Sequence, residues 1–176
     1  MQRNLVLTLT GPDRIGIVEN VTGLLVARDG NVEISRMARL GGEFAMLMLV
    51  SVPAEQVAGL ESDLERLAAQ GFKVTITQAR QTHAEAHPGW LHYCIDVQGA
   101  DHEGIIQEVA RYLSHRGINI ESMDSETTPA PISGVPLFTM TAEVAVPPEL
   151  ADQGWEAGLE ELSSHLNLEI RVVAMT

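Results

Sequence analysis

The chain has 176 residues, of which 45% are hydrophobic and 20% charged, with one cysteine and a net charge of −13. This composition is sufficient for a packed core and differs from that of disordered chains. The sequence has no run of about 18 apolar residues, which argues against a transmembrane helix, and "MQRNLVLTLTG" reaches a polar turn too early for a signal peptide. We therefore expect a folded, cytoplasmic protein in which the lone Cys94 excludes an internal disulfide.

The negative charge is concentrated in the second half of the chain. Residues 1–88 carry 8 basic and 10 acidic side chains, whereas residues 89–176 carry 3 and 14. Binding to nucleic acid or to an anionic membrane surface needs cationic side chains that contact phosphate. The charge therefore predicts no direct contact with nucleic acid or with a membrane.

The first half predicts a βαββαβ order of elements. Apolar residues recur every three or four positions in two segments, as in amphipathic helices, and alternate or run together in four others, as in strands. Gly41-Gly42 marks a hairpin between two of these strands. The predicted elements are a strand at 4–10, a helix at about 14–29, strands at 31–40 and 43–52, a helix after Pro53 and a strand at 72–78.

A shift of 88 residues aligns the second half with the first. Nine of the 23 positions from 11 to 33 are identical in the two halves, which indicates a duplicated domain. We expect a first domain at 1–80, a linker at 81–90 and a second domain at 91–176. The predicted elements of the second copy are strands at 91–98, about 118–128, 136–146 and 167–174, and helices at about 104–116 and 148–165.

The largest difference between the copies is the connection of their middle strands. The Gly41-Gly42 hairpin is replaced by "TTPAPISGVP" at residues 127–136, a proline-rich loop that we expect to interrupt the pairing of the strands.

The βαββαβ order predicts an α+β fold, with two tandem ferredoxin-like domains that each place two helices on one face of a four-stranded antiparallel sheet. The other face of each sheet is then uncovered. Strand 43–52 is apolar on both sides, so we expect the uncovered face to pack against another sheet or a partner. A homodimer is the natural arrangement.

The turn between the first strand and the first helix occurs twice, as "TGPDRIGIV" and "QGADHEGII". Unpaired N–H groups and the positive end of the dipole at a helix start favour an anion. Gly16 and Gly104 lack the Cβ that would hold a carboxylate away. Asp13 and Asp101 are placed to cap the two helices.

Asn31 and Asn119 begin the strand after each helix, where we expect the chain to return to the same end of the sheet. An asparagine offers an acceptor and two donors, so it suits both the ammonium and the carboxylate of an amino acid. Such glycines, aspartates and asparagines are also ordinary turn residues. Residue chemistry alone therefore leaves a purely architectural role open.

The repeat, with "GPDRIGIV…DGNVE" and "GADHEGII…GINIE", resembles the ACT domain, a small regulatory module that binds amino acids and similar metabolites. The tandem arrangement, "EISRMARLGGEFAMLMLVS" and "TTPAPISGVPLFTM" resemble more narrowly the glycine cleavage system transcriptional repressor family. The resemblance implies a ligand at interfaces between ACT units, held by the turn of one unit. It places ligand contacts on Gly11, Asp13, Arg14, Ile15, Gly16, Ile17 and Asn31, and on Gly99, Asp101, His102, Gly104, Ile105 and Asn119.

The same resemblance implies a non-enzymatic sensor, without a cofactor, that binds an amino acid such as glycine and modulates transcription through a DNA-binding activator. The alternative is a structural interaction module without a small-molecule ligand. The sequence departs from the ACT pattern at Ile15 and Glu103, where proline is frequent. Because Glu103 adds a negative charge, we expect the first turn to be the better anion site.

Catalytic motifs and metal-ligand patterns are absent from the sequence. It contains no phosphate loop, nucleophile elbow or dinucleotide fingerprint. His83, His87 and His92 lie near one another, but no cysteine or carboxylate completes the spacing of a metal site. We expect neither an enzyme nor a metal centre.

Overall fold

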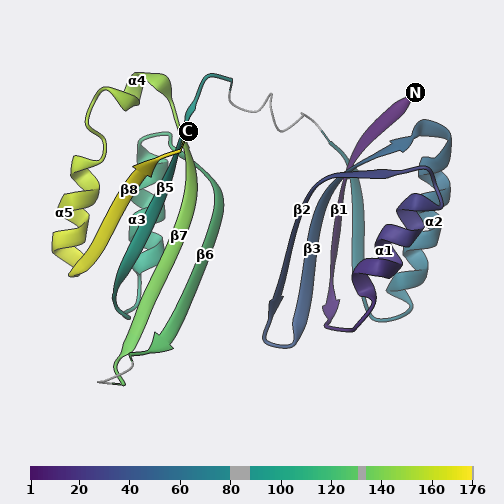
Figure 1. Cartoon of the computed structure of the whole chain (residues 1–176), viewed down its shortest axis with the longest axis horizontal. Helices are drawn as coiled ribbons and strands as arrows, with labels where there is room; N and C mark the ends of the chain where they lie inside the picture. The colour runs from purple at the N-terminus through teal and green to yellow at the C-terminus, as the bar shows by residue number, and fades with distance from the viewer. Residues whose placement is uncertain (80–87, 131–133, 176) are drawn as a thin grey trace. The chain divides into compact units, whose positions relative to one another are not determined.

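The computed structural model describes residues 1–79, 88–130 and 134–175, which form two compact units, Met1–His83 and Ala84–Thr176. Each unit is a four-stranded antiparallel sheet with its helices on one face (Figure 1). This confirms the predicted α+β fold of two tandem ferredoxin-like domains. The predicted linker at 81–90 lies mostly outside the described residues, and its bounds stay a prediction.

The first unit has the strand order β2-β3-β1-β4, so the first strand lies in the interior of the sheet. Its elements are β1 (Gln2–Pro12), α1 (Ile17–Val26), β2 (Asn31–Leu40), β3 (Glu43–Pro53), the 3-10 helix η1 (Ala54–Gln56), α2 (Val57–Ala68) and β4 (Lys73–Gln78). The second unit repeats this order as β6-β7-β5-β8. Its elements are β5 (Leu91–Ala100), α3 (Ile105–His115), β6 (Asn119–Pro129), β7 (Pro136–Val146), α4 (Pro148–Ala151), α5 (Ala157–Leu166) and β8 (Leu168–Ala174).

The final helical segment of the second unit is interrupted, so the prediction of one helix at 148–165 is wrong. The chain leaves the helix after α4, and Gly154 adopts a left-handed φ of 63° before α5 begins. Trp155 in this turn is only 4% exposed and packs edge-on against Tyr93, with ring centroids 5.3 Å apart. The burial of this large ring stabilises the break.

The strands β6 and β7 pair further than the sequence predicts. Their ladder continues to the pair Pro129 and Pro136, so the first three residues of "TTPAPISGVP" belong to β6 rather than to a loop. Proline is tolerated there because β6 is an edge strand and the pair is the last of the ladder.

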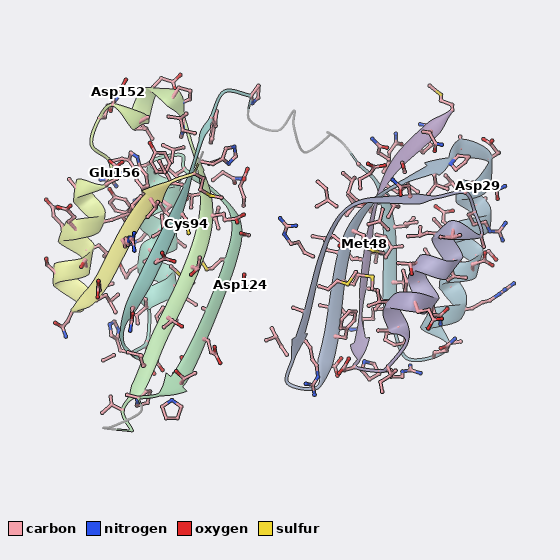
Figure 2. The ribbon with its side chains drawn as sticks, in the orientation of Figure 1. Asp29, Met48, Cys94, Asp124, Asp152 and Glu156 are labelled. Atoms are coloured by element: carbon pink, nitrogen blue, oxygen red, sulfur yellow. The ribbon has the colours of Figure 1, made fainter. Side chains whose placement is uncertain are left out.

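The core of each unit lies between its sheet and its helices. Side chains of a strand alternate between the two faces, and those that face the helices are buried. Met46, Met48 and Met140 belong to these cores, with exposures of 1–2%. Figure 2 labels Met48 on β3.

The opposite, helix-free faces of the two sheets differ in chemistry. In the first unit, the register places Val6, Leu49 and Ile34 side by side on this face, with Leu47 in the next row. In the second unit, the helix-free face carries five carboxylates and one arginine, namely Asp96, Asp124, Glu126, Glu143, Glu169 and Arg171. One face is therefore apolar at its centre, and the other is acidic.

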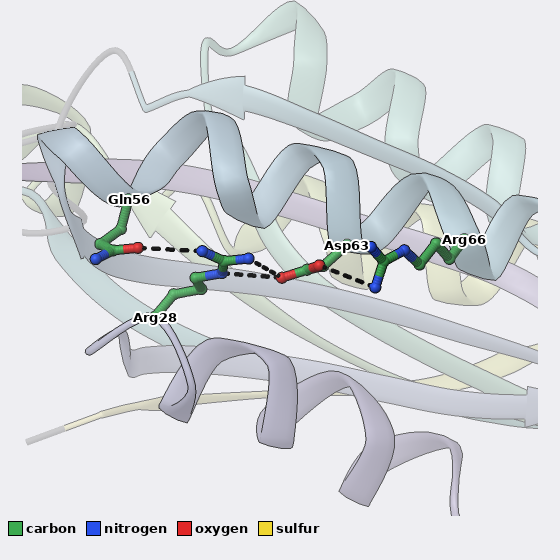
Figure 3. A network of polar contacts seen from close by, with 4 residues as sticks. All are labelled: Arg28, Gln56, Asp63 and Arg66. Carbon is green, nitrogen blue, oxygen red and sulfur yellow. Dashed lines mark hydrogen bonds and ion pairs between the residues drawn. The ribbon is translucent and has the colours of Figure 1, made fainter.

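A polar network ties the two helices of the first unit together (Figure 3). Arg28, after the end of α1, approaches the Asp63 carboxylate on α2 with Nε at 2.9 Å and with a second nitrogen at 2.7 Å. Arg66 lies 3.4 Å from the other carboxylate oxygen, and Arg28 also donates to Gln56. Asp63 is 9% exposed, so little water reaches its carboxylate. The two arginines supply the positive charge that a buried carboxylate needs.

Candidate functional site

The repeated turn has the same backbone in both units. Gly16 and Gly104 are the N-cap residues of α1 and α3, with φ of 89° and 93°. A Cβ on either glycine would meet no atom within 4 Å, so the left-handed conformation rather than crowding requires glycine. Both glycines therefore precede the helices instead of lying in their first turn.

Asp13 and Asp101 do not cap these helices, so this prediction is wrong. Neither N-cap position has a side-chain capping bond. The left-handed glycine turns the preceding residues away from the helix start, and Asp13 Oδ2 instead lies 2.7 Å from Arg39 Nε. Asp101 has no ion-pair partner among the described residues.

Gly11 and Gly99 serve packing. A Cβ on Gly11 would lie 2.5 Å from Phe72 Cδ1, and one on Gly99 would lie 2.5 Å from Leu168 Cδ2. Backbone oxygens of the neighbouring segment would also be only 3.2 Å away. These two predicted site residues therefore allow the first strand to approach the start of the last strand.

The turn of the second unit borders a pocket of about 520 Å³. Four predicted residues line it: Asp101, His102, Gly104 and Ile105. The rest of its wall consists of Ile106, Gln107, Ser125, Glu126, Thr127 and Phe138, which come from α3, β6 and β7. The β6 and β7 residues are not among the predicted site residues, because the motif covers only the turn. The signal that could find them is the 88-residue shift, which aligns Thr127 with Arg39 of the first unit.

The start of α3 supplies hydrogen-bond donors to this pocket. The first intrahelical bond joins Glu108 N–H to the Gly104 carbonyl at 2.9 Å. The N–H groups of Ile105, Ile106 and Gln107 precede it, and such groups have no partner within their own helix. All three residues line the pocket. Ile105 is 2% exposed and belongs to the core, as Ile17 does in the first unit, so it offers its backbone to the pocket.

Arg14 and His102 make equivalent contacts at one side of the turn. Arg14 donates to the Gln70 carbonyl and places its guanidinium 4.5 Å from the centre of the Phe72 ring. His102 Nε2 lies 3.2 Å from the Leu166 carbonyl oxygen. Each side chain thus ties the turn to the end of the last helix. In the first unit, Ile15 lies between Arg14 and the N-cap residue Gly16 and is fully exposed.

Asn31 and Asn119 lie at the opposite end of their sheets from the turn, so their predicted position is wrong. Asn31 pairs with Ser51, which pairs with Asn4 near the start of β1. The turn follows Pro12, eight residues and about 26 Å further along β1. The helix carries the chain back along the length of the sheet, so the next strand starts at the far end. Asn119 has the same place in the second unit, where it pairs with Ala145 opposite His92.

Of the three histidines that lie near one another in the sequence, only His92 is among the described residues. His83 and His87 lie outside the described residues, and His92 Nδ1 lies 3.2 Å from Glu121. No group of three or more metal-ligating side chains occurs in residues 1–79, 88–130 and 134–175. In the same segments, no helix is long and apolar enough to cross a membrane.

The duplicated fold and the repeated glycine turn define a tandem ACT-domain protein, and comparison with known proteins agrees. The ACT domain family matches residues 3–77. The glycine cleavage system transcriptional repressors of Escherichia coli (strain K12) and Shigella flexneri are each 32% identical to this chain over 129 residues, which cover 73% of the chain and 67% of the relative. The chain therefore belongs to the glycine cleavage system transcriptional repressor family.

Solved structures show the same fold over the whole chain. An unknown protein from Galdieria sulphuraria is 35% identical, with full coverage of both chains and a TM-score of 0.88. A structure provisionally named as a glycine cleavage system transcriptional repressor is 21% identical, covers 100% of this chain and 99% of its own, and has a TM-score of 0.70. The second likeness supports the fold alone.

Proposed function

We propose that the protein is a non-enzymatic regulator that binds a free amino acid, glycine being the first candidate, at the turn of an ACT unit. The observation that supports this most is the pocket of about 520 Å³ at the start of α3, lined by four residues that the family resemblance singles out. Helix N–H groups suit the carboxylate that every free amino acid carries. Membership of the repressor family supports a regulatory role.

The regulatory output of this sensor would pass through a protein partner, a DNA-binding activator, in the cytoplasm. A net charge of −13 and a strongly acidic second half disfavour direct contact with DNA. An amino acid can change the association with the partner only if it binds one arrangement of the protein more tightly than another. The proposal therefore requires that ligand and partner binding be thermodynamically linked.

We further propose that the protein forms a homodimer through the helix-free face of the first unit, with a second copy of the same face as its occupant. Val6, Ile34, Leu47 and Leu49 form the apolar centre of this face. Four strands of about seven residues each span roughly 20 Å by 23 Å, so a pair of faces buries about 900 Å², close to the about 1,000 Å² of a specific interface. The acidic face of the second unit would repel a copy of itself.

Asn31 and Asn119 would contribute to an amino-acid site only from a neighbouring unit, because each lies at the far end of its own sheet. The far position of the two asparagines is compatible with the family resemblance, which implies ligand sites at interfaces between ACT units.

Isothermal titration of the full chain with the common amino acids tests the proposal. We expect at least one amino acid to bind with a dissociation constant below about 1 mM, which corresponds to a binding free energy of about −4.1 kcal/mol. Glycine and L-serine are the first candidates. If none binds, the alternative of a structural interaction module without a ligand becomes the better account. In that case the dimer would persist unchanged by any amino acid.

A further inference from the structure

We propose that Arg39 keeps the first turn closed to ligand, and that Thr127 at the same position opens the second turn to an amino acid whose ammonium group binds Asp101. This inference rests on the proposed function, since it states which turn senses the amino acid and which side chains decide it.

Arg39 and Thr127 occupy the same place in the two folds. Arg39 pairs with Phe44 on β3, which also pairs with Gly11 of the turn. Thr127 pairs with Phe138 on β7, which also pairs with Gly99. Strand alternation points these residues to the helix side of the sheet, toward the start of the first helix. The difference between the turns is therefore one of side chains on a shared backbone.

In the first unit, the aspartate of the turn, Asp13, already forms an ion pair with a cationic side chain, Arg39. Arg39 Nε lies 2.7 Å from Asp13 Oδ2, where an ammonium group of a ligand would otherwise bind. Two residues earlier on the same side of β2, Met37 adds a long side chain. Because the ion pair is largely exposed, its strength is modest, and the closure comes from charge neutralisation together with the bulk of the two side chains.

In the second unit, the same space is open. Thr127 and Ser125 replace the arginine and the methionine, and both line the pocket with Asp101. Asp101 has no ion-pair partner among the described residues. The exchange of two long side chains for two short hydroxyl side chains thus leaves both a cavity and an uncompensated carboxylate.

This arrangement selects a zwitterion. The donors at the start of α3 favour a carboxylate, whereas Asp101 at the rim favours an ammonium group and repels a simple anion. The buried Phe138 gives the pocket an apolar wall. A free α-amino acid satisfies both ends, but an α-hydroxy acid of the same size offers Asp101 only a neutral hydroxyl donor in place of an ammonium charge. The geometry therefore reverses the ranking that the charge of Glu103 suggests.

Calorimetric titration with glycine and L-serine tests the assignment on the full chain. We expect one site per chain. D101N should weaken binding about tenfold or more, because the acceptor of the ammonium group loses its negative charge, and T127R should weaken binding to a similar extent. The matched controls, D13N and T128R, should bind as the wild type does, since Thr128 points to the other face of β6. Glycolate should bind at least about tenfold more weakly than glycine.

The reverse exchange, R39T together with M37S, should add a second site per chain. Circular dichroism establishes whether each variant is folded. If T127R does not fold, D101N still tests the inference, because asparagine has nearly the same shape as aspartate. Wild-type binding by D101N, or an equal loss in D13N, would overturn the inference while leaving the sensor role intact. An unchanged stoichiometry in the double variant would contradict the role of Arg39. Lack of any amino-acid binding by the wild type would overturn the proposed function itself.

Discussion

At the turn before the first helix, the two units keep one backbone and exchange its side chains. The left-handed glycine, the tie to the last helix and the paired phenylalanine recur in both. The ion pair of Asp13 with Arg39 occurs only in the first unit, and the pocket of about 520 Å³ borders the turn of the second. The two units thus share the backbone of the turn, whereas the side chains around it differ.

The helix-free faces show the same pattern of shared backbone and divergent chemistry. Arg36, Leu47 and Leu49 of the first unit correspond by register to Asp124, Thr141 and Glu143 of the second. The apolar centre of the first face can be buried in an interface, whereas the carboxylates of the second face need contact with water. The first unit is therefore suited to assembly and the second to remain accessible.

The largest expected effect concerns this difference between the faces. L49E would place a charge between the apolar Val6 and Ile34 in the centre of the proposed dimer interface and should weaken the dimer about 100-fold or more. T141E, on β7 of the acidic face, should leave the dimer unchanged. Sedimentation velocity over a range of concentrations measures both. A monomeric wild type, or equal effects of the two changes, would remove the distinction between the faces.

A smaller effect should separate the helix layers of the two units. D63A leaves Arg28 without its carboxylate and should cost about 2 kcal/mol of unfolding free energy. In the second unit, the guanidinium of the corresponding arginine, Arg116, lies 3.8 Å from the centre of the Tyr112 ring. We therefore expect D63A to leave the stability of the second unit unchanged. E65A on the exposed side of α2 is the control.

Urea denaturation can resolve the two units in this experiment, because both tryptophans, Trp90 and Trp155, lie in the second unit. Far-ultraviolet circular dichroism should show an earlier transition in D63A, whereas tryptophan fluorescence should not shift. An equal shift in both signals would mean that the units unfold together.

The smallest effect concerns Cys94 on β5, which Figure 2 labels together with Asp124 on β6. Burial, and then the charges of Asp96 and Glu143, raise the pKa of the Cys94 thiol above its ordinary value of 9.0. Because the folded thiol holds its proton to higher pH than the unfolded one, its contribution to stability is complete below pH 9 and decreases as the pH rises further.

Alkylation by iodoacetamide at pH 8 should therefore be slower than for a free thiol, since the thiolate is the reactive form. E143Q should accelerate it, and E149Q on α4 should not. Faster alkylation of the wild type than of a model thiol would contradict this account of the acidic face.

Much of the fold could be predicted from the sequence because local patterns encode it. The periodicities gave the strands, and the 88-residue shift showed the duplication. The break around Gly154 could not be predicted, because it depends on the contact of Trp155 with Tyr93 from a distant strand. Likewise, the far position of Asn31 follows from the path of α1 along the sheet and not from its neighbours in sequence.

Less of the candidate site could be predicted. The motif singled out Asp101, His102, Gly104 and Ile105, which do border a pocket. It could not show that Asp13 pairs with Arg39, because these residues are 26 positions apart and meet only when β2 and β3 are in register with β1. Likewise, only the pairing of the strands shows that Ser125 and Thr127 line the same pocket as Asp101.

The most direct test of the central claim is a titration of the ¹⁵N-labelled full chain with glycine and L-serine, followed by nuclear magnetic resonance of the backbone amides. The account predicts that the amides of Ile105, Ile106 and Gln107 shift on binding, while those of Ile17, Val18 and Glu19 in the first unit stay unchanged. Saturable shifts confined to the first turn, or equal shifts at both turns, would contradict it.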